Sequence, residues 1–126
     1  MIAADSSSLI AHLSGEQGED VEILDQALSD HLLVLPPVVL AELLSDPKLP
    51  ALLSELLKVL PLLETTHGYW HRAGALRAKA LSRGRKARLA DTLIAQSCLD
   101  HDVPLIARDR DFRVFAKFAG LELLPV

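Results

Sequence analysis

The sequence has one cysteine, few aromatic residues and no long apolar run, and each shortage excludes a class of protein. Cys98 lies in an apolar stretch without a partner, so no internal disulfide holds the fold, and a reducing, cytoplasmic setting is expected. The longest nearly apolar stretches, such as 36–44, are too short to span a bilayer, so we expect no membrane association. Residues 1–4 are too few for the apolar core of a signal peptide. Tyr69 and Trp70 are too few to form a platform on which nucleic-acid bases stack.

What the chain does have is a globular balance of residues. It contains 126 residues, of which 50% are hydrophobic and 24% are charged. A chain of this length buries roughly two-thirds of the surface that it exposes when unfolded. We therefore expect one domain, residues 1–126, with a core of its own.

Charge is unevenly distributed along the chain. Residues 1–66 contain eleven acids and two lysines, a net charge of −9, whereas residues 67–126 contain eleven basic residues and six acids, a net charge of +5. A basic half on an acidic protein indicates a local surface for a polyanion such as nucleic acid. The alternative is that these side chains only solvate helix faces.

Short apolar runs alternate with segments of helical periodicity. Strands are predicted at 1–4, 32–35, 62–65, 103–107 and 121–124, and helices begin near residues 6, 21, 37, 49, 68, 87 and 109. Strands that alternate with helices predict a parallel sheet covered by helices on both faces.

Two aspartates follow predicted strands. Asp5 ends the first, and Asp109 comes two residues after the fourth. In an open parallel sheet, ligands bind at the carboxyl ends of the strands, so both side chains are expected at the same edge. The alternative is that each aspartate only caps the next helix.

Two further carboxylates stand in apolar helices. Glu42 is the one charge in an otherwise apolar helix, so we expect it to be buried and either paired or metal-bound. Asp91 lies in the first turns of a helix among leucine, isoleucine and alanine. Glu42 could instead occupy a narrow exposed strip, and Asp91 could serve only the helix dipole.

Convergence of these four carboxylates would imply a cation between them. Carboxylates that lie close together repel one another and raise one another's pKa unless a cation neutralises them. Oxygen ligands select hard ions, and Mg²⁺ or Mn²⁺ suits a site that is completed by water and a phosphate. One or two such ions can support phosphodiester cleavage.

Four motifs in order resemble PIN domains, in particular the VapC-type toxins of toxin–antitoxin pairs. The motifs are Asp5-Ser-Ser-Ser-Leu-Ile10, Val38-Val-Leu-Ala-Glu-Leu43, Leu89-Ala-Asp-Thr-Leu-Ile-Ala95 and Pro104-Leu-Ile-Ala-Arg-Asp-Arg-Asp-Phe112. Each motif is short, but together they cover almost the whole chain.

The resemblance implies a three-layer α/β/α fold with a five-stranded parallel sheet. It also implies Mg²⁺- or Mn²⁺-dependent cleavage of RNA that leaves a 5′-phosphate and a 3′-hydroxyl. The candidate catalytic and metal-binding acids are Asp5, Glu42, Asp91 and Asp109; Asp111 would bind metal through water, and Ser7 would support Asp5 from a second layer. One departure is Ala107, where the family usually has threonine or serine.

Basic residues lead directly into Asp91. Arg83, Arg85, Lys86 and Arg88 are expected to hold RNA phosphates that the acids would otherwise repel. The substrate would be a tRNA, rRNA or mRNA. The alternative is a solvated helix face and loop.

The leucine-rich segment 49–63 carries more leucine than one small core needs. The resemblance indicates that part of it docks a second copy, giving a homodimer, or a segment of a cognate antitoxin. A catalytically inactive PIN-like module that binds RNA or a partner is the main alternative function, and a DNA nuclease is another. A receiver domain is rejected because residues 50–60 contain no aspartate.

Overall fold

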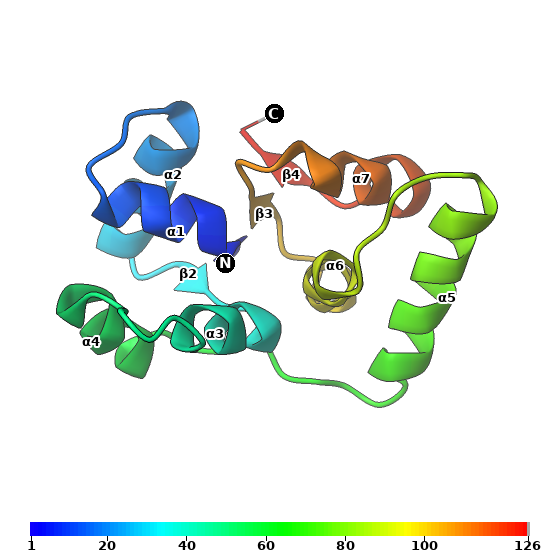
Figure 1. Ribbon diagram of the computed structural model, residues 1–126, viewed down its shortest axis with the longest axis horizontal. Helices are drawn as coiled ribbons and strands as arrows, with labels where there is room; N and C mark the ends of the chain where they lie inside the picture. Colours follow the sequence, from blue (N-terminus) through cyan, green and yellow to red (C-terminus); the bar gives the residue numbers. More distant parts are fainter. Residues whose placement is uncertain (126) are drawn as a thin grey trace.

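The computed structural model describes residues 1–125, in which a parallel sheet is flanked by helices (Figure 1). In chain order the elements are β1 (Ile2–Ala4), α1 (Ser6–Leu13), α2 (Glu19–Ser29), β2 (Leu33–Val34), α3 (Pro37–Leu44), α4 (Ala51–Val59), α5 (Tyr69–Ser82), α6 (Leu89–His101), β3 (Leu105–Ile106), the 3-10 helix η1 (Arg110–Phe112), α7 (Arg113–Ala119) and β4 (Leu123–Leu124). The alternation predicted from the sequence is therefore confirmed. The helix expected from residue 109 divides into η1 and α7.

The sheet has four parallel strands in the order β2-β1-β3-β4 within residues 1–125. The expected fifth strand at 62–65 is reduced to a single parallel bridge between Leu35 and Leu62. Two backbone hydrogen bonds of 2.9 Å flank this bridge, one from the Leu35 amide and one to the Leu35 carbonyl. Pro36 and Pro37 follow directly and start α3, so β2 offers no further residues with which a longer strand could pair.

The chain changes direction across the sheet between β1 and β3. From β1 it moves to β2 at one edge, and from β2 it returns past β1 to β3 and β4. Because parallel crossovers are right-handed, the two directions place their helices on opposite faces, which gives the three expected layers. In Figure 1, α1 and α2 lie together on one side, and α5, α6 and α7 pack against one another on the other.

The carboxyl ends of β1 and β3 meet at this change of direction, which is where ligands bind in open sheets. Both strands are buried, and Ala3 pairs with Leu105 while Ala4 pairs with Ile106. Phe112 and Phe115 fill the core beneath the segment that follows β3. No helix of the described residues is long and apolar enough to cross a membrane.

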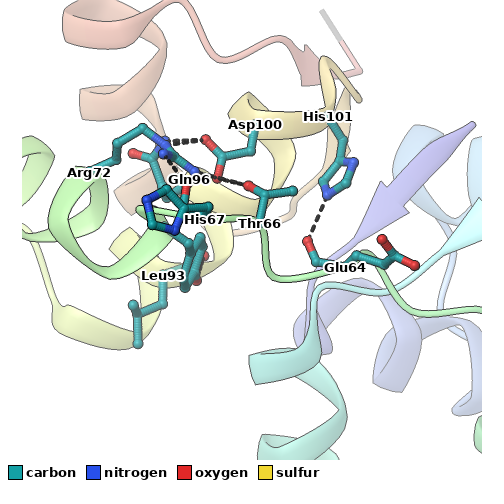
Figure 2. Close-up of polar contacts among 9 residues, drawn as sticks. Glu64, Thr66, His67, Arg72, Leu93, Gln96, Asp100 and His101 are labelled. Atoms are coloured by element: carbon teal, nitrogen blue, oxygen red, sulfur yellow. Dashed lines mark hydrogen bonds and ion pairs between the residues drawn. The ribbon is translucent and has the colours of Figure 1, made fainter.

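A polar network fixes α5 against α6. Arg72 donates to both carboxylate oxygens of Asp100, from Nε to Oδ1 at 2.9 Å and from Nη2 to Oδ2 at 2.7 Å. Gln96 Nε2 donates to Asp100 Oδ1 at 2.8 Å, and Thr66 adds a longer contact of 3.3 Å. Figure 2 shows these side chains converging between the two helices. The network holds α5, which leads into the loop that carries the basic residues, at a fixed position beside α6, which carries Asp91.

Candidate active site

Three aspartates from two segments form the tightest acidic cluster of the described residues. Asp91 lies in the first turn of α6, Asp109 caps η1 three residues after β3 ends, and Asp111 lies in η1; each offers a carboxylate oxygen within 4.8 Å of the others. Asp111, which was expected to bind metal through water, belongs to this group. We call these three residues the aspartate trio.

Asp5 lies beside the trio at the end of β1. It caps α1, because its Oδ1 accepts from the Ser8 amide at 3.1 Å, while its Oδ2 accepts from Ser7 Oγ at 2.8 Å. Burial raises the pKa of Asp5, the serine hydrogen bonds lower it in part, and the charge of Asp109 raises it further. Ser7 therefore contacts the carboxylate that it was expected to support.

Glu42 lies close to the same carboxylates, but it is not buried as the apolar sequence of its helix suggested. Helix α3 buries Val39 and Leu43, whereas Glu42 and Leu44 are exposed. The alternative of an exposed strip is thus the observed one. Partial burial raises the pKa of Glu42, and the charges of Asp91 and Asp5 raise it further.

Asp91 has an oxygen without a partner. Its Oδ2 is buried and accepts no hydrogen bond in the described structure. Burial raises the pKa of Asp91, and the charges of Asp109 and Asp111 raise it further, while Arg88 and Lys86 lower it. A buried carboxylate oxygen without a donor is costly, so a ligand that satisfies it gains free energy.

The donor set fits a divalent cation. Every candidate ligand is a carboxylate oxygen, and the trio spans a distance that one ion can bridge. The unpaired Oδ2 of Asp91 is the oxygen that such an ion would satisfy. Mutual repulsion among the acids would fall on binding.

The four basic residues expected to hold RNA divide into three environments. Lys86 Nζ contacts Asp111 Oδ2 at 3.1 Å, so its charge already neutralises one member of the trio. Arg88 caps α6 through its carbonyl, and its charge lowers the pKa of Asp91. Arg83 and Arg85 lie over the ring of Phe118, and neither forms an ion pair with a carboxylate of residues 1–125.

A charged clamp next to Asp109 was missed from the sequence. Arg108 Nε and Nη2 donate to the two oxygens of the buried Asp20 at 2.9 and 3.0 Å, and Asp20 Oδ2 also accepts from Ser8 Oγ at 3.2 Å. Arg108 holds the pKa of Asp20 below its usual range. The clamp ties the loop that carries Asp109 to the helix that Asp5 caps.

Ala107 has no side-chain donor, so Arg108 is the residue that fixes the loop before Asp109. From the sequence alone, an acid in the first turn of a helix, such as Asp20, is expected only to interact favourably with the helix dipole. Its contact with a residue 88 positions away is not visible in the sequence.

A groove opens beside Glu42. It encloses about 460 Å³ between α1, α3 and the start of α4. Ile10 and Leu52 line it and are 50% and 79% exposed, which is unusual for large apolar side chains. Two acids, Glu42 and Asp46, and one base, Lys48, line its wall, which leaves one net negative charge.

Comparison with known proteins identifies the same fold in one protein family and in several solved structures. A family model described as the PIN domain matches residues 2–118. No curated protein matches the sequence. Among solved structures, VapBC2 from Rickettsia felis bound to a DNA fragment from its promoter has a TM-score of 0.76 at 18% identity, with 98% of this chain and 97% of that chain covered. FitAcB from Neisseria gonorrhoeae has a TM-score of 0.70 at 20% identity, with 98% and 96% covered. DNA-bound VapBC from Salmonella typhimurium has a TM-score of 0.74 at 17% identity, with 98% and 97% covered. At these identities the likeness shows the shared fold.

Proposed function

The chain belongs to the PIN-domain family, whose members are generally nucleases, and from this premise we propose that it is a divalent-metal-dependent endoribonuclease, the toxin of a toxin–antitoxin pair. The observation that carries the proposal is the convergence of Asp5, Glu42 and the aspartate trio at the carboxyl edge of the sheet. Carboxylates that lie this close together repel one another and destabilise the folded chain unless a cation neutralises them.

The trio and Asp5 would hold Mg²⁺ or Mn²⁺, with Glu42 completing the site from α3. When bound, such an ion supplies a Lewis acid for phosphodiester hydrolysis that leaves a 5′-phosphate and a 3′-hydroxyl. Ser7 and the Arg108 clamp keep the carboxylates of Asp5 and Asp109 in place.

Basic side chains would make this acidic site accessible to RNA. Lys86 and Arg88 lie next to the trio and lower the repulsion that an approaching phosphate meets. Arg83 and Arg85 extend the positive surface along the same loop. We propose these four residues as the RNA-binding set, and a tRNA, rRNA or mRNA as the substrate.

The test is cleavage of a mixed tRNA, rRNA and mRNA pool with Mn²⁺ or Mg²⁺. Wild type should cut, and EDTA or Asp5→Asn should abolish the cuts. Asp25→Asn is the matched control, because Asp25 is exposed and lies outside the site. Cuts that persist in Asp5→Asn would refute the proposed site.

The alternative of a catalytically inactive binding module gives a different result. Such a module would bind RNA without cutting it and would show no saturable uptake of Mn²⁺ that depends on Asp91. Cleavage of DNA rather than RNA by the wild type would replace the proposed substrate.

We further propose that the groove beside Glu42 takes an antitoxin segment. VapBC proteins form a family of toxin–antitoxin systems, and the fold of this chain is similar to theirs, which supports a cognate partner. The exposed Ile10 and Leu52 suit an apolar helix face, and the acids suit a basic residue on it. The substitution Leu52→Glu should break a complex with the product of the adjacent gene, whereas Leu81→Glu on α5 should not. A complex that survives Leu52→Glu would place the partner elsewhere.

A homodimer and a cytoplasmic site of action complete the proposal. Exposed apolar side chains on α4, such as Val59 at 75%, support contact with a second copy. Light scattering of the purified chain at several concentrations tests this, and a mass of one chain throughout would contradict it.

A further inference from the structure

Four basic side chains from two separate segments gather at the C-terminal end of α7. The Arg83 and Arg85 guanidinium carbons lie 5.5 and 5.9 Å from the centre of the Phe118 ring, and Lys117 Nζ lies 5.7 Å from it. Lys79 Nζ donates to the Phe118 carbonyl at 2.9 Å. We call Lys79, Arg83, Arg85 and Lys117 the Phe118 cation cluster.

The fold holds these side chains together through backbone contacts. The Arg85 amide donates to the Ala80 carbonyl at 3.0 Å, and Arg77 Nε donates to the Ala87 carbonyl at 2.8 Å, so the loop between α5 and α6 is fixed at both ends. Figure 1 shows this loop passing beside α7. The backbone of this loop therefore places Arg83 and Arg85 beside Phe118.

Local structure accounts for only part of the positive charge. The C-terminal end of a helix attracts cations, which explains Lys79 and Lys117. One cation over an aromatic ring is also favourable. Arg83 and Arg85 add two more charges at the same ring, and like charges so close repel. Within residues 1–125 no member of the cluster forms an ion pair with a carboxylate, although the chain as a whole has a net charge of −4.

We propose that the Phe118 cation cluster binds phosphates of the RNA strand at a position separate from the carboxylates and anchors the substrate there. This inference rests on the proposed function, and it adds Lys79, Lys117 and Phe118 to the RNA-binding surface. Unpaired cations at one place form a site for a polyanion.

The path of the loop connects the anchor to the candidate active site. Arg85 belongs to the cluster, and the next residue, Lys86, contacts Asp111 of the trio at 3.1 Å. One strand that follows this loop can therefore touch both. Because basic groups lie around the Phe118 ring, it acts as a support for them rather than as a platform for a base. The anchor is thus expected to be indifferent to RNA sequence.

The experiment measures binding of a 20-nucleotide oligouridylate in the Asp5→Asn background, so that the probe survives. The test variant is Arg83→Gln with Lys117→Gln, which removes one charge from each segment. The matched control is Arg83→Lys with Lys117→Arg, which keeps both charges at the same positions. A second control, Lys58→Gln, removes an exposed charge on α4.

The salt dependence gives the expected size of the effect. Each phosphate contact with a single strand contributes a slope of about −0.7 to log K against log salt concentration. Loss of two contacts should make the slope shallower by about 1.4 and should weaken binding about 25-fold at 0.1 M salt. Both controls should keep the slope of the Asp5→Asn parent, and thermal unfolding should confirm that every variant is folded.

Three outcomes would overturn the inference. The first is a test variant whose slope equals that of its controls, and the second is a parent that does not bind the oligouridylate. The third is a test variant that loses affinity for a polyglutamate peptide but not for RNA, which would assign the cluster to an acidic protein partner. Failure of the proposed function would be separate, because it would appear as absent metal-dependent cleavage by the wild type.

Discussion

Replacing Asp91 by asparagine should stabilise the metal-free protein and abolish its stabilisation by Mn²⁺. Burial raises the pKa of Asp91, and the charges of Asp109 and Asp111 raise it further. A raised pKa means that the charged form is less favourable in the folded chain than in the unfolded one. Asparagine removes this charge, and its amide can donate toward the neighbouring carboxylates.

The size of the effect follows from the balance of two terms. A buried acceptor without a donor, such as Asp91 Oδ2, costs about 1–3 kcal/mol, and the half-buried side chain of Asp91 favours the lower end of this range. Asp91 lies in the first turn of α6, where the helix dipole returns about 0.5 kcal/mol to a negative charge. We therefore expect a net gain of about 1 kcal/mol on substitution, which raises the unfolding temperature of a chain of this length by about 4 °C.

Mn²⁺ should reverse the order of the two proteins. An ion present at a hundredfold excess over its dissociation constant stabilises the folded chain by about 2.7 kcal/mol, or about 10 °C. This increment requires the Asp91 oxygens, so Asp91→Asn should not show it. With Mn²⁺ the wild type should then melt about 6 °C above the variant.

Differential scanning fluorimetry at pH 7.5, with EDTA and with a Mn²⁺ titration, measures both quantities. Asp25→Asn is the control, because loss of this exposed charge should change stability by less than about 0.5 kcal/mol and should leave the Mn²⁺ increment intact. The reasoning fails if metal-free Asp91→Asn melts below the wild type, or if Mn²⁺ stabilises both proteins equally.

Three further predictions concern the clamp, the ion pairs and the thiol. A Cβ at Gly18 would lie 2.6 Å from Asp20 Oδ1, whereas a Cβ at Gly15, where φ is also positive, would meet no atom within 4 Å. Gly18→Ala should therefore lower the free energy of unfolding in urea by at least about 1 kcal/mol more than Gly15→Ala does. Equal losses in the two variants would contradict the crowding at Gly18. Arginine partners lower the pKa values of Asp20 and Asp100. The ion pairs therefore stabilise the folded chain above about pH 4, and this stabilisation should be lost as the pH falls through the folded-state pKa values of the two aspartates. Asp20→Asn should flatten that part of the curve of unfolding free energy against pH, and an unchanged curve would refute the prediction. Burial raises the pKa of Cys98 to about 12, so its thiol should not react with iodoacetamide at pH 8 until denaturant is added. Labelling of Cys98 in the native protein would show that solvent reaches the thiol.

Periodicity and turn residues were enough to predict the order of strands and helices. Apolar runs that end at Asp5 and near Asp109 placed both aspartates at the edge of a parallel sheet, because parallel strands share one carboxyl edge. Periodicity misjudged α3, since an apolar composition does not reveal how many faces a neighbour covers. Glu42 therefore lies at an exposed rim that the sequence pattern assigned to the interior.

Contacts between segments that are distant in the sequence could not be predicted from local sequence patterns. The clamp between Asp20 and Arg108 depends on the packing of α2 against the end of β3, and the pairing of Lys86 with Asp111 depends on the fold of the loop before α6. Charge composition predicted a basic surface but could not divide its members between the carboxylates and Phe118. Arg85 and Lys86 are neighbours in the sequence, yet Arg85 lies over Phe118 and Lys86 contacts Asp111, a difference that only the folded structure shows.

Capping and metal binding were posed as alternatives for Asp5 and Asp109, but the geometry allows both roles at once. Each aspartate caps through Oδ1, which accepts from the Ser8 amide in one case and from the Asp111 amide at 2.8 Å in the other. A carboxylate has lone pairs for further ligands, so the cap fixes the side chain without consuming it. Because the cap restrains the side chain before any cation arrives, less conformational entropy is lost on binding. Aspartate is thus favoured over glutamate at both positions, since its shorter side chain is the one that a cap can hold.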